Sequence, residues 1–400
     1  MAFIDEKTRS ISCILGMTAL CMIVANSGAT TSDTSNAALL YYQALLQRPE
    51  PDDYRIIEDV LHDAEPSDRL RKYLKDSFVQ ETIMLAESGT RISNCDWGRR
   101  SSGVAALGTS AMQEVTHLAK LLCANARVLS HDGEHRAALE SCLAMRRFAV
   151  HLGDDSSMLY GMAYRVDATA LRCIQYILGS MPSETTTLKW LQHQLQALNG
   201  APWQQPGAII RCEQDARVAG AFRMLSGSDG DWKERFVEGI ADAEARERAH
   251  SQTEDELLAQ ARRSYREFVA SAISIIESDL PMDDKFEAVM EIEGRLKKLA
   301  AEGDPVILLQ GSWDSWARWL RDIPSHALWY NSTLAAVEIY LAKARTGQLP
   351  AACPEDLPKA PYDGRDFEYE RTETGFVLRY ARKDHVRRTM REIEFKVSNE

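Results

Sequence analysis

The sequence predicts a mainly α-helical protein that ends in a small α+β module. Apolar residues recur at intervals of three and four over most of the chain, which places them on one face of a helix. Glycine, proline and aspartate interrupt this pattern at distances that suit antiparallel, repeat-like hairpins of the tetratricopeptide type. Only near the C-terminus do apolar and polar residues alternate, as they do in a β-hairpin.

Composition indicates a folded protein with an acidic surface. Of the 400 residues, 45% are hydrophobic and 26% are charged, as is usual for globular chains. Lys and Arg number 47 against 59 Asp and Glu, so the net charge is −12. Such a surface repels phosphate backbones, and we expect no nucleic-acid partner. A basic run near the C-terminus is the local exception, and a solvated strand is its other interpretation: Arg379, Arg382, Lys383, Arg387, Arg388 and Arg391.

Residues 1–29 have the pattern of an export signal. Lys7 and Arg9 precede the charge-free run Ile11–Ala25, and small residues lead up to Ala29. The run has 15 residues, whereas a membrane-spanning helix needs about 20. We therefore expect cleavage after Ala29 and a periplasmic or extracellular protein. An uncleaved anchor is the alternative, and it would be the chain's only contact with a membrane.

A polar linker, residues 30–35, leads into a helical body that we place at residues 36–324. Its strongest helical signal runs from Thr109 to Met181, where Asp132-Gly133 and then Gly153 separate three apolar stripes. Other helices are expected at about 37–48, 53–63, 66–88, 183–198, 206–225, 231–271 and 283–301.

The C-terminal module is placed at residues 325–400. A helix at about 325–346 is expected to end at Gly347, and a proline-rich loop follows. Alternating residues then predict a hairpin made of Phe367–Arg371 and Phe376–Tyr380. A third strand is expected at 392–397.

Three stretches of the helical body resemble an uncharacterised group of exported proteins from planctomycete bacteria. They are NAALLYYQALLQRPEPDD (36–53), CDWG (95–98) and LCANARVLSHDGEHRAALESCLAMRRFAVHLGDD (122–155). The resemblance covers about half of the chain and implies no particular activity.

The end of the chain is similar to the globular part of type II secretion pseudopilins. The similar segment is AAVEIYLAKARTGQLPAACPEDLPKAPYDGRDFEYERTETGFVLRY (335–380). An E-x-Y element, a G-x-x-P turn and a P-x-D-G-like turn carry the resemblance: Glu338 and Tyr340, Gly347 and Pro350, and Pro361, Asp363 and Gly364. The pseudopilin processing site and assembly helix do not precede this segment, so the resemblance implies a packing module rather than a fibre subunit.

The segment from His131 to His135 matches the H-x-x-E-H pattern of some zinc peptidases. That chemistry needs both histidines on one helical face, with Glu134 beside them as general base. Asp132 and Gly133 fall where two apolar stripes break, so we expect a turn there and no metal. A zinc-dependent hydrolase that uses His131, Glu134 and His135 remains an alternative.

Cys95 offers a second catalytic hypothesis, a thiol-dependent hydrolase. A nucleophilic cysteine needs a histidine nearby, and His117 is the only one close in sequence. The favoured interpretation is structural, with Trp97 holding its loop against the helices.

Two further groups are interpreted as core. Four tryptophans accompany His326, and their helical spacing favours packing over a carbohydrate platform: Trp313, Trp316, Trp319 and Trp329. Cys123 and Cys142 stand nine residues on either side of Asp132-Gly133. We therefore expect both in one layer of a helical hairpin, as buried thiols.

These observations favour a non-catalytic, exported helical interaction or scaffold protein of the cell envelope, with a protein partner. Helical arrays bind through extended faces, and we assign no catalytic, cofactor-binding or metal-ligating residue. The alternatives are the hydrolase at His131/Glu134/His135 or at Cys95, and a binder of a small ligand or glycan at the tryptophans. The sequence leaves the partner and the oligomeric state open.

Overall fold

The fold is that of a computed structural model. It describes residues 36–62, 65–97, 109–153, 157–198, 232–306, 310–355, 357–384 and 387–397. Side chains are not described at 109–112, 157–160, 300, 310–325 and 382–389. The expected export signal, the linker 30–35, the helix at 206–225 and Cys212 lie outside these residues. Contacts divide the chain into residues 1–36 and residues 37–400, and the helices and strands of the described residues all belong to the second unit.

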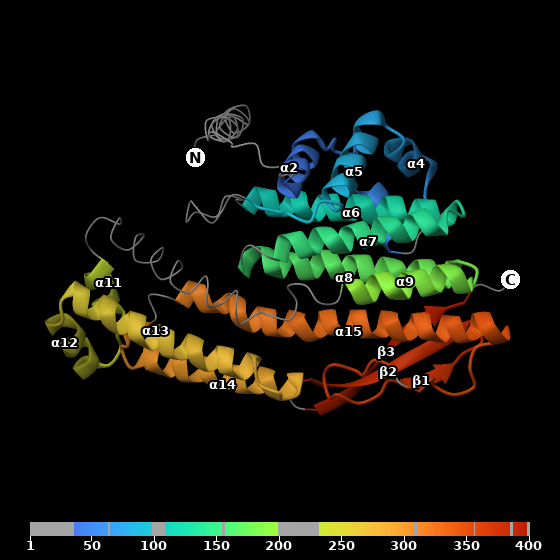
Figure 1. The fold of residues 1–400 in the computed structure, drawn as a ribbon. Coiled ribbons are helices and arrows are strands. Elements are labelled where there is room, and N and C mark those ends of the chain that lie inside the picture. The colour runs from blue at the N-terminus through green and yellow to red at the C-terminus, as the bar shows by residue number, and fades with distance from the viewer. Residues whose placement is uncertain are drawn as a thin grey trace. The chain divides into compact units, whose positions relative to one another are not determined.

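The chain is mainly helical and carries a small three-stranded antiparallel sheet near its C-terminus, as predicted (Figure 1). No helix among the described residues has the length and the apolar character needed to cross a membrane.

Four helices open the described chain. They are α2 (Ala37–Gln47), α3 (Arg55–Leu61), α4 (Asp68–Leu74) and α5 (Ser77–Gly89). The single helix expected after Pro66 is wrong, because α4 and α5 are separate. Ser67 caps α4 by accepting a hydrogen bond from the Leu70 amide, and Asp76 accepts one from the Phe78 amide at the start of α5. A capping side chain of this kind satisfies an otherwise unpaired amide, which favours a new helix start.

Three long helices form the centre of the body: α6 (Thr109–His131), α7 (His135–Gly153) and α8 (Ser157–Ser180). The predicted breaks at Asp132-Gly133 and Gly153 are confirmed. Each of the three helices packs against the other two, and α9 (Thr185–Ala197) follows. Most of the buried residues on these helices are apolar, apart from a few polar ones such as Arg146 and Asp167, which explains the strength of the sequence signal.

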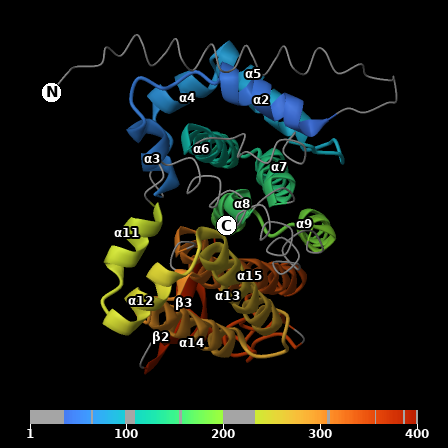
Figure 2. The same ribbon diagram turned by 90° about the vertical axis from the view of Figure 1, so that its left-hand side faces the viewer.

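The stretch 231–271, for which a continuous helix and a broken one were both open, forms three helices. They are α11 (Trp232–Gly239), α12 (Ala243–Ser251) and α13 (Glu254–Ile276), after which α14 (Met282–Ala301) lies beside α13 (Figure 2). Asp242 caps α12, and Thr253 with Glu256 forms a capping box at α13. A small separate core holds this corner together: Trp232, Phe236, Val237, Ile240, Ala245, Ala249 and Leu257.

The last helix, α15, spans Gln310–Thr346 and has 37 residues. It was expected to begin at residue 325, after Pro324, so this boundary is wrong. Proline removes one backbone hydrogen bond from a helix, but α15 packs against α8, α9 and α14 along its length, and these contacts offset the loss. The side chains of Trp313, Trp316 and Trp319 lie outside the described residues.

Three antiparallel strands complete the described fold: β1 (Glu368–Arg371), β2 (Gly375–Asp384) and β3 (Arg387–Lys396), in that order. The predicted hairpin is confirmed, and the third strand begins earlier than expected. Phe376 stacks on Phe395 and packs against Tyr340 of α15. A Cβ at Gly375 would lie 1.9 Å from the carbonyl oxygen of Phe395, so glycine is required for this pairing.

Candidate functional site: an open cleft at the end of α15

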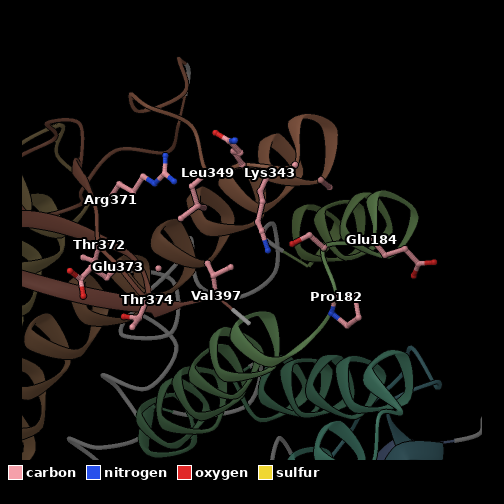
Figure 3. Close-up of a pocket in the computed structure, with 14 residues that line it drawn as sticks. Pro182, Glu184, Lys343, Leu349, Arg371, Thr372, Glu373, Thr374 and Val397 are labelled. Carbon is pink, nitrogen blue, oxygen red and sulfur yellow. The ribbon is translucent and has the colours of Figure 1, made fainter. Parts of the chain in front are cut away.

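An open cleft of about 660 Å³ lies where three segments distant in sequence meet (Figure 3). Its walls are the α8–α9 loop at 182–184, the end of α15 with the following turn at 343–349, and the β1–β2 turn at 371–375. Val397, just after β3, completes the lining. The predicted C-terminal module therefore supplies most of the cleft.

Local sequence fixes each wall in place. Gly347 has φ +75°, a left-handed conformation that favours glycine after a helix, and its amide donates to the Lys343 carbonyl at 2.7 Å. In the β1–β2 turn the Thr372 amide donates to the Gly375 carbonyl at 2.9 Å. The Val397 amide donates to the Thr374 carbonyl at 2.8 Å. Backbone hydrogen bonds therefore hold the end of β3 to the turn.

Two cations of the lining extend over the cleft from different elements (Figure 3). Lys343 reaches from α15 into the space beside Val397, and Arg371 extends from β1 toward Leu349. Within the described ranges no carboxylate lies within salt-bridge distance of Lys343 or Arg371. Arg379, on the neighbouring strand, bonds instead to both Glu370 and Glu392. Arg379 therefore stabilises the sheet through its ion pairs, whereas Lys343 and Arg371 are available to contact a ligand.

The two carboxylates of the lining lie away from Lys343 (Figure 3). Glu184 points out of the cleft, and its carboxylate accepts a hydrogen bond from the Thr187 hydroxyl at 2.6 Å. Glu373 lies across the β1–β2 turn from Lys343. The space beside Val397 is therefore reached by a cation and not by these carboxylates.

Among the described residues, no hydroxyl of the lining is hydrogen-bonded to a lysine or carboxylate of the lining. Hydroxyls come from Ser183, Thr372 and Thr374, and no histidine, cysteine or aspartate is among the lining residues. Nucleophilic catalysis needs a base within hydrogen-bond reach of the nucleophile.

The predicted turn in the H-x-x-E-H segment is confirmed. His131 ends α6, His135 begins α7, and Glu134 lies between the two helices. Arg71 contacts both His131 (3.0 Å) and Asp132 (2.5 Å), whereas His135 faces the Ser130 hydroxyl. The two histidines do not share a helical face, so they lack the zinc-peptidase geometry. Among the described residues no group of three His, Cys, Asp or Glu side chains could hold a metal ion.

The structural interpretation of Trp97 is confirmed. Trp97 is 3% exposed, stacks on Tyr41 and donates its indole N–H to the His151 carbonyl at 2.8 Å. The other expected element of a thiol site, His117, contacts Arg48 and Tyr54.

His151 is the histidine that the fold brings to the Cys95 loop, and no sequence pattern pointed to it. Its Nδ1 lies 2.8 Å from the Tyr41 hydroxyl. Burial lowers the pKa of His151 to about 4. Such a histidine stays neutral and is a weak base near neutral pH.

A buried ionic cluster joins α7, α8 and α15. Asp167 has no exposed surface, and Arg146 is 1% exposed. Arg146 Nε lies 2.7 Å from Asp167 Oδ1, and His326 Nε2 lies 2.5 Å from Oδ2. Burial alone would raise the pKa of Asp167, but the charges of Arg146 and His326 outweigh it and lower that pKa. Sequence reasoning missed this cluster, although a carboxylate beside Val166 on an apolar face was a usable signal.

Three thiols meet in the core of the helical body. Cys173 of α8 interacts with both Cys123 of α6 and Cys142 of α7. All three are free and buried. This confirms the prediction that Cys123 and Cys142 are buried thiols. The hydrogen bond to Cys173, followed by burial, raises the pKa of Cys123. The hydrogen bond with Cys123 lowers the pKa of Cys173, but the one with Cys142 and burial outweigh it and raise that pKa. These thiols are core residues.

The two residues of the E-x-Y element tie α15 to its neighbours. Glu338 accepts a hydrogen bond from the Gln192 side chain of α9, and the Tyr340 hydroxyl donates to the Lys396 carbonyl of β3. Asp363 and Gly364 form a turn in the loop before β1. These residues position the walls of the cleft.

The basic run at the C-terminus lies on β2 and β3. Arg379 is neutralised by its two carboxylate partners. The side chains of Arg382, Lys383, Arg387 and Arg388 lie outside the described residues.

Compared with family models, with curated proteins and with solved structures, the chain gives no significant match. The resemblances to the planctomycete group and to pseudopilins therefore stay predictions.

Proposed function

We propose that this protein is a non-catalytic, exported helical interaction or scaffold protein of the cell envelope, and that it binds a protein partner. The observation that supports this most is the cleft at the end of α15. Its walls are held by backbone hydrogen bonds, and its lining presents cations, carboxylates and hydroxyls, with no hydroxyl of the described lining hydrogen-bonded to a lysine or carboxylate of that lining. Such a lining favours recognition over chemistry.

The groups that suggested a hydrolase have other contacts. His131 faces Arg71, and His135 faces Ser130 on the far side of the turn. Cys95 lies two residues before Trp97, which anchors this loop by donating its indole N–H to the His151 carbonyl. Burial lowers the pKa of His151, so it is a poor base. A hydrolase would need these groups to rearrange before they could act together.

Site-specific photo-crosslinking tests the proposal in the native cell envelope. A benzophenone side chain at Thr374, in the cleft, is compared with one at Lys298, an exposed residue of α14. We expect a discrete crosslinked protein from Thr374 and none from Lys298.

Two results would contradict the proposal. One is equal crosslinking from both positions, or none from either. The other is hydrolysis of peptide or ester substrates by the purified chain that is lost in Cys95→Ser or His131→Ala. Both variants change side chains that are at least partly exposed, so a loss of activity would not reflect a loss of folding.

A further inference from the structure

We infer that the cleft at the end of α15 binds an acidic peptide segment of the partner protein, with one carboxylate at Lys343 and another at Arg371. This inference rests on the proposed function and specifies the chemistry of its partner. Charge, apolar surface and shape each support it.

Charge favours an anionic occupant. Lys343 and Arg371 come from different elements, both border the open space, and neither has an ionic partner in the described part of the chain (Figure 3). A carboxylate of the occupant gains charge-assisted hydrogen bonds from an ammonium or from a guanidinium, so two acidic side chains of a peptide can each meet one of these cations. The positive end of the α9 dipole, at Thr185, lies beside the same loop. Lys343 itself offsets the negative end of α15.

Apolar surface separates a peptide from a free anion. Pro182, Leu349 and Val397 line the cleft around Lys343. Leu349 is 9% exposed, so most of its side chain is packed against the protein and only a small part faces the cleft. An occupant that fills this space presents an apolar side chain next to its carboxylate, as a peptide does and an inorganic anion does not.

Shape favours an extended chain over a small molecule. A volume of about 660 Å³ falls in the range of about 300–1,000 Å³ that is common for ligand sites. The cleft is open rather than enclosed, so a continuous chain can enter and leave it. An enclosed cavity would instead favour a small molecule.

The chain has a net charge of −12, and the cleft lining itself holds Glu184 and Glu373 beside its two cations. At a distance, an acidic partner is repelled, and salt screens that repulsion beyond about 8 Å at 0.15 M ionic strength. Within the cleft the contact is direct. Binding is therefore best measured at that ionic strength.

The experiment uses the full mature chain and two blocked, fluorescein-labelled hexapeptides. One alternates leucine with glutamate, and the other alternates leucine with glutamine. Fluorescence polarisation is expected to show binding of the glutamate peptide and at least fivefold weaker binding of the glutamine peptide. Lys343→Met with Arg371→Gln should weaken binding of the glutamate peptide about five- to twentyfold, the range expected for two partly exposed ionic contacts.

The matched control is Arg345→Gln with Lys359→Gln, which changes the net charge equally outside the cleft lining. It should leave the affinity within twofold. A thermal melt of each double variant shows whether the fold is retained, and Arg371→Glu gives a second, single-site test with the same expected loss.

Three outcomes would overturn the inference: equal affinity for the two peptides, an unchanged affinity in the cleft variant, or complete competition by citrate at an equal concentration. The last would identify a site for small anions. A partner protein could still crosslink to Thr374 in each of these cases. Failure of the inference is therefore distinguishable from failure of the proposed function.

Discussion

Replacing Asp167 with alanine should destabilise the protein strongly, because Asp167 is the anion of the buried cluster. Its carboxylate bonds to Arg146 Nε at 2.7 Å and to His326 Nε2 at 2.5 Å. In the described structure Arg146 Nη1 already has no hydrogen-bond partner. Asp167→Ala would leave the whole guanidinium buried and unpaired beside the Tyr330 ring.

The size of the effect follows from burial. Removing one partner of a buried ion pair costs about 3–5 kcal/mol, because the remaining charge stays desolvated. The matched control is Glu140→Ala, which breaks the Arg136–Glu140 pair on α7. Both residues of that pair are about half exposed, and such i,i+4 pairs contribute about 0.3–0.5 kcal/mol.

The measurement is urea denaturation at pH 7 and at lower pH. The pKa of Asp167 is lowered in the folded state, so its contribution is complete above an unfolded pKa of about 3.9 and is lost as the pH falls further. Asp167→Asn should therefore flatten the loss of stability below pH 4. If Asp167→Ala costs less than about 1 kcal/mol, the cluster is not a determinant of stability and this reasoning is wrong.

Three further predictions concern the pKa of His151, the anchoring role of Trp97 and the reactivity of the cysteine thiols. Because burial lowers the pKa of His151 from 6.5 to about 4, the unfolded state binds a proton first. Stability should fall by about 3 kcal/mol between pH 6.5 and pH 4. Urea titrations of His151→Gln should lack this slope, and an unchanged slope would assign it elsewhere. Trp97→Phe leaves the His151 carbonyl without its donor and should cost about 1–3 kcal/mol, and a thermal melt equal to wild type would refute the anchoring role. A thiol reagent should modify Cys95 and Cys353 in the native state, whereas three thiols should react only after unfolding: Cys123, Cys142 and Cys173. Mass mapping of native-state adducts on α6, α7 or α8 would contradict this.

The sequence was sufficient where one local signal decided the outcome. The break at Asp132-Gly133 is confirmed because a glycine turn coincides with the end of two apolar stripes. It was insufficient where two local signals competed. Asp76 sits inside an apolar periodicity, and its capping hydrogen bond starts a new helix there. At Pro324 the outcome is reversed, since contacts made by distant helices keep α15 continuous.

The candidate site was predictable only in its parts. Gly347 and the β-hairpin were expected from turn signals and alternation. Their meeting with the α8–α9 loop was not, because Ser183 and Arg371 are far apart in the chain and the packing of α8 against both α15 and β3 brings them together. The pairing of Asp167 with His326 is of the same kind, since the two residues are 159 positions apart in the sequence. Periodicity reports which face is buried, and it does not report which buried groups meet.

The length of α15 has a mechanical consequence. At about 1.5 Å per residue, its 37 residues form a long helix that a bend at one point would divide into two parts. A proline removes one backbone hydrogen bond from a helix, so α15 should bend most easily at Pro324. His326, which is clamped to Asp167, lies on the same side of Pro324 as Lys343. We therefore expect bending of α15 to concentrate at Pro324, so that a displacement of the residues before it has little effect on Lys343 in the cleft.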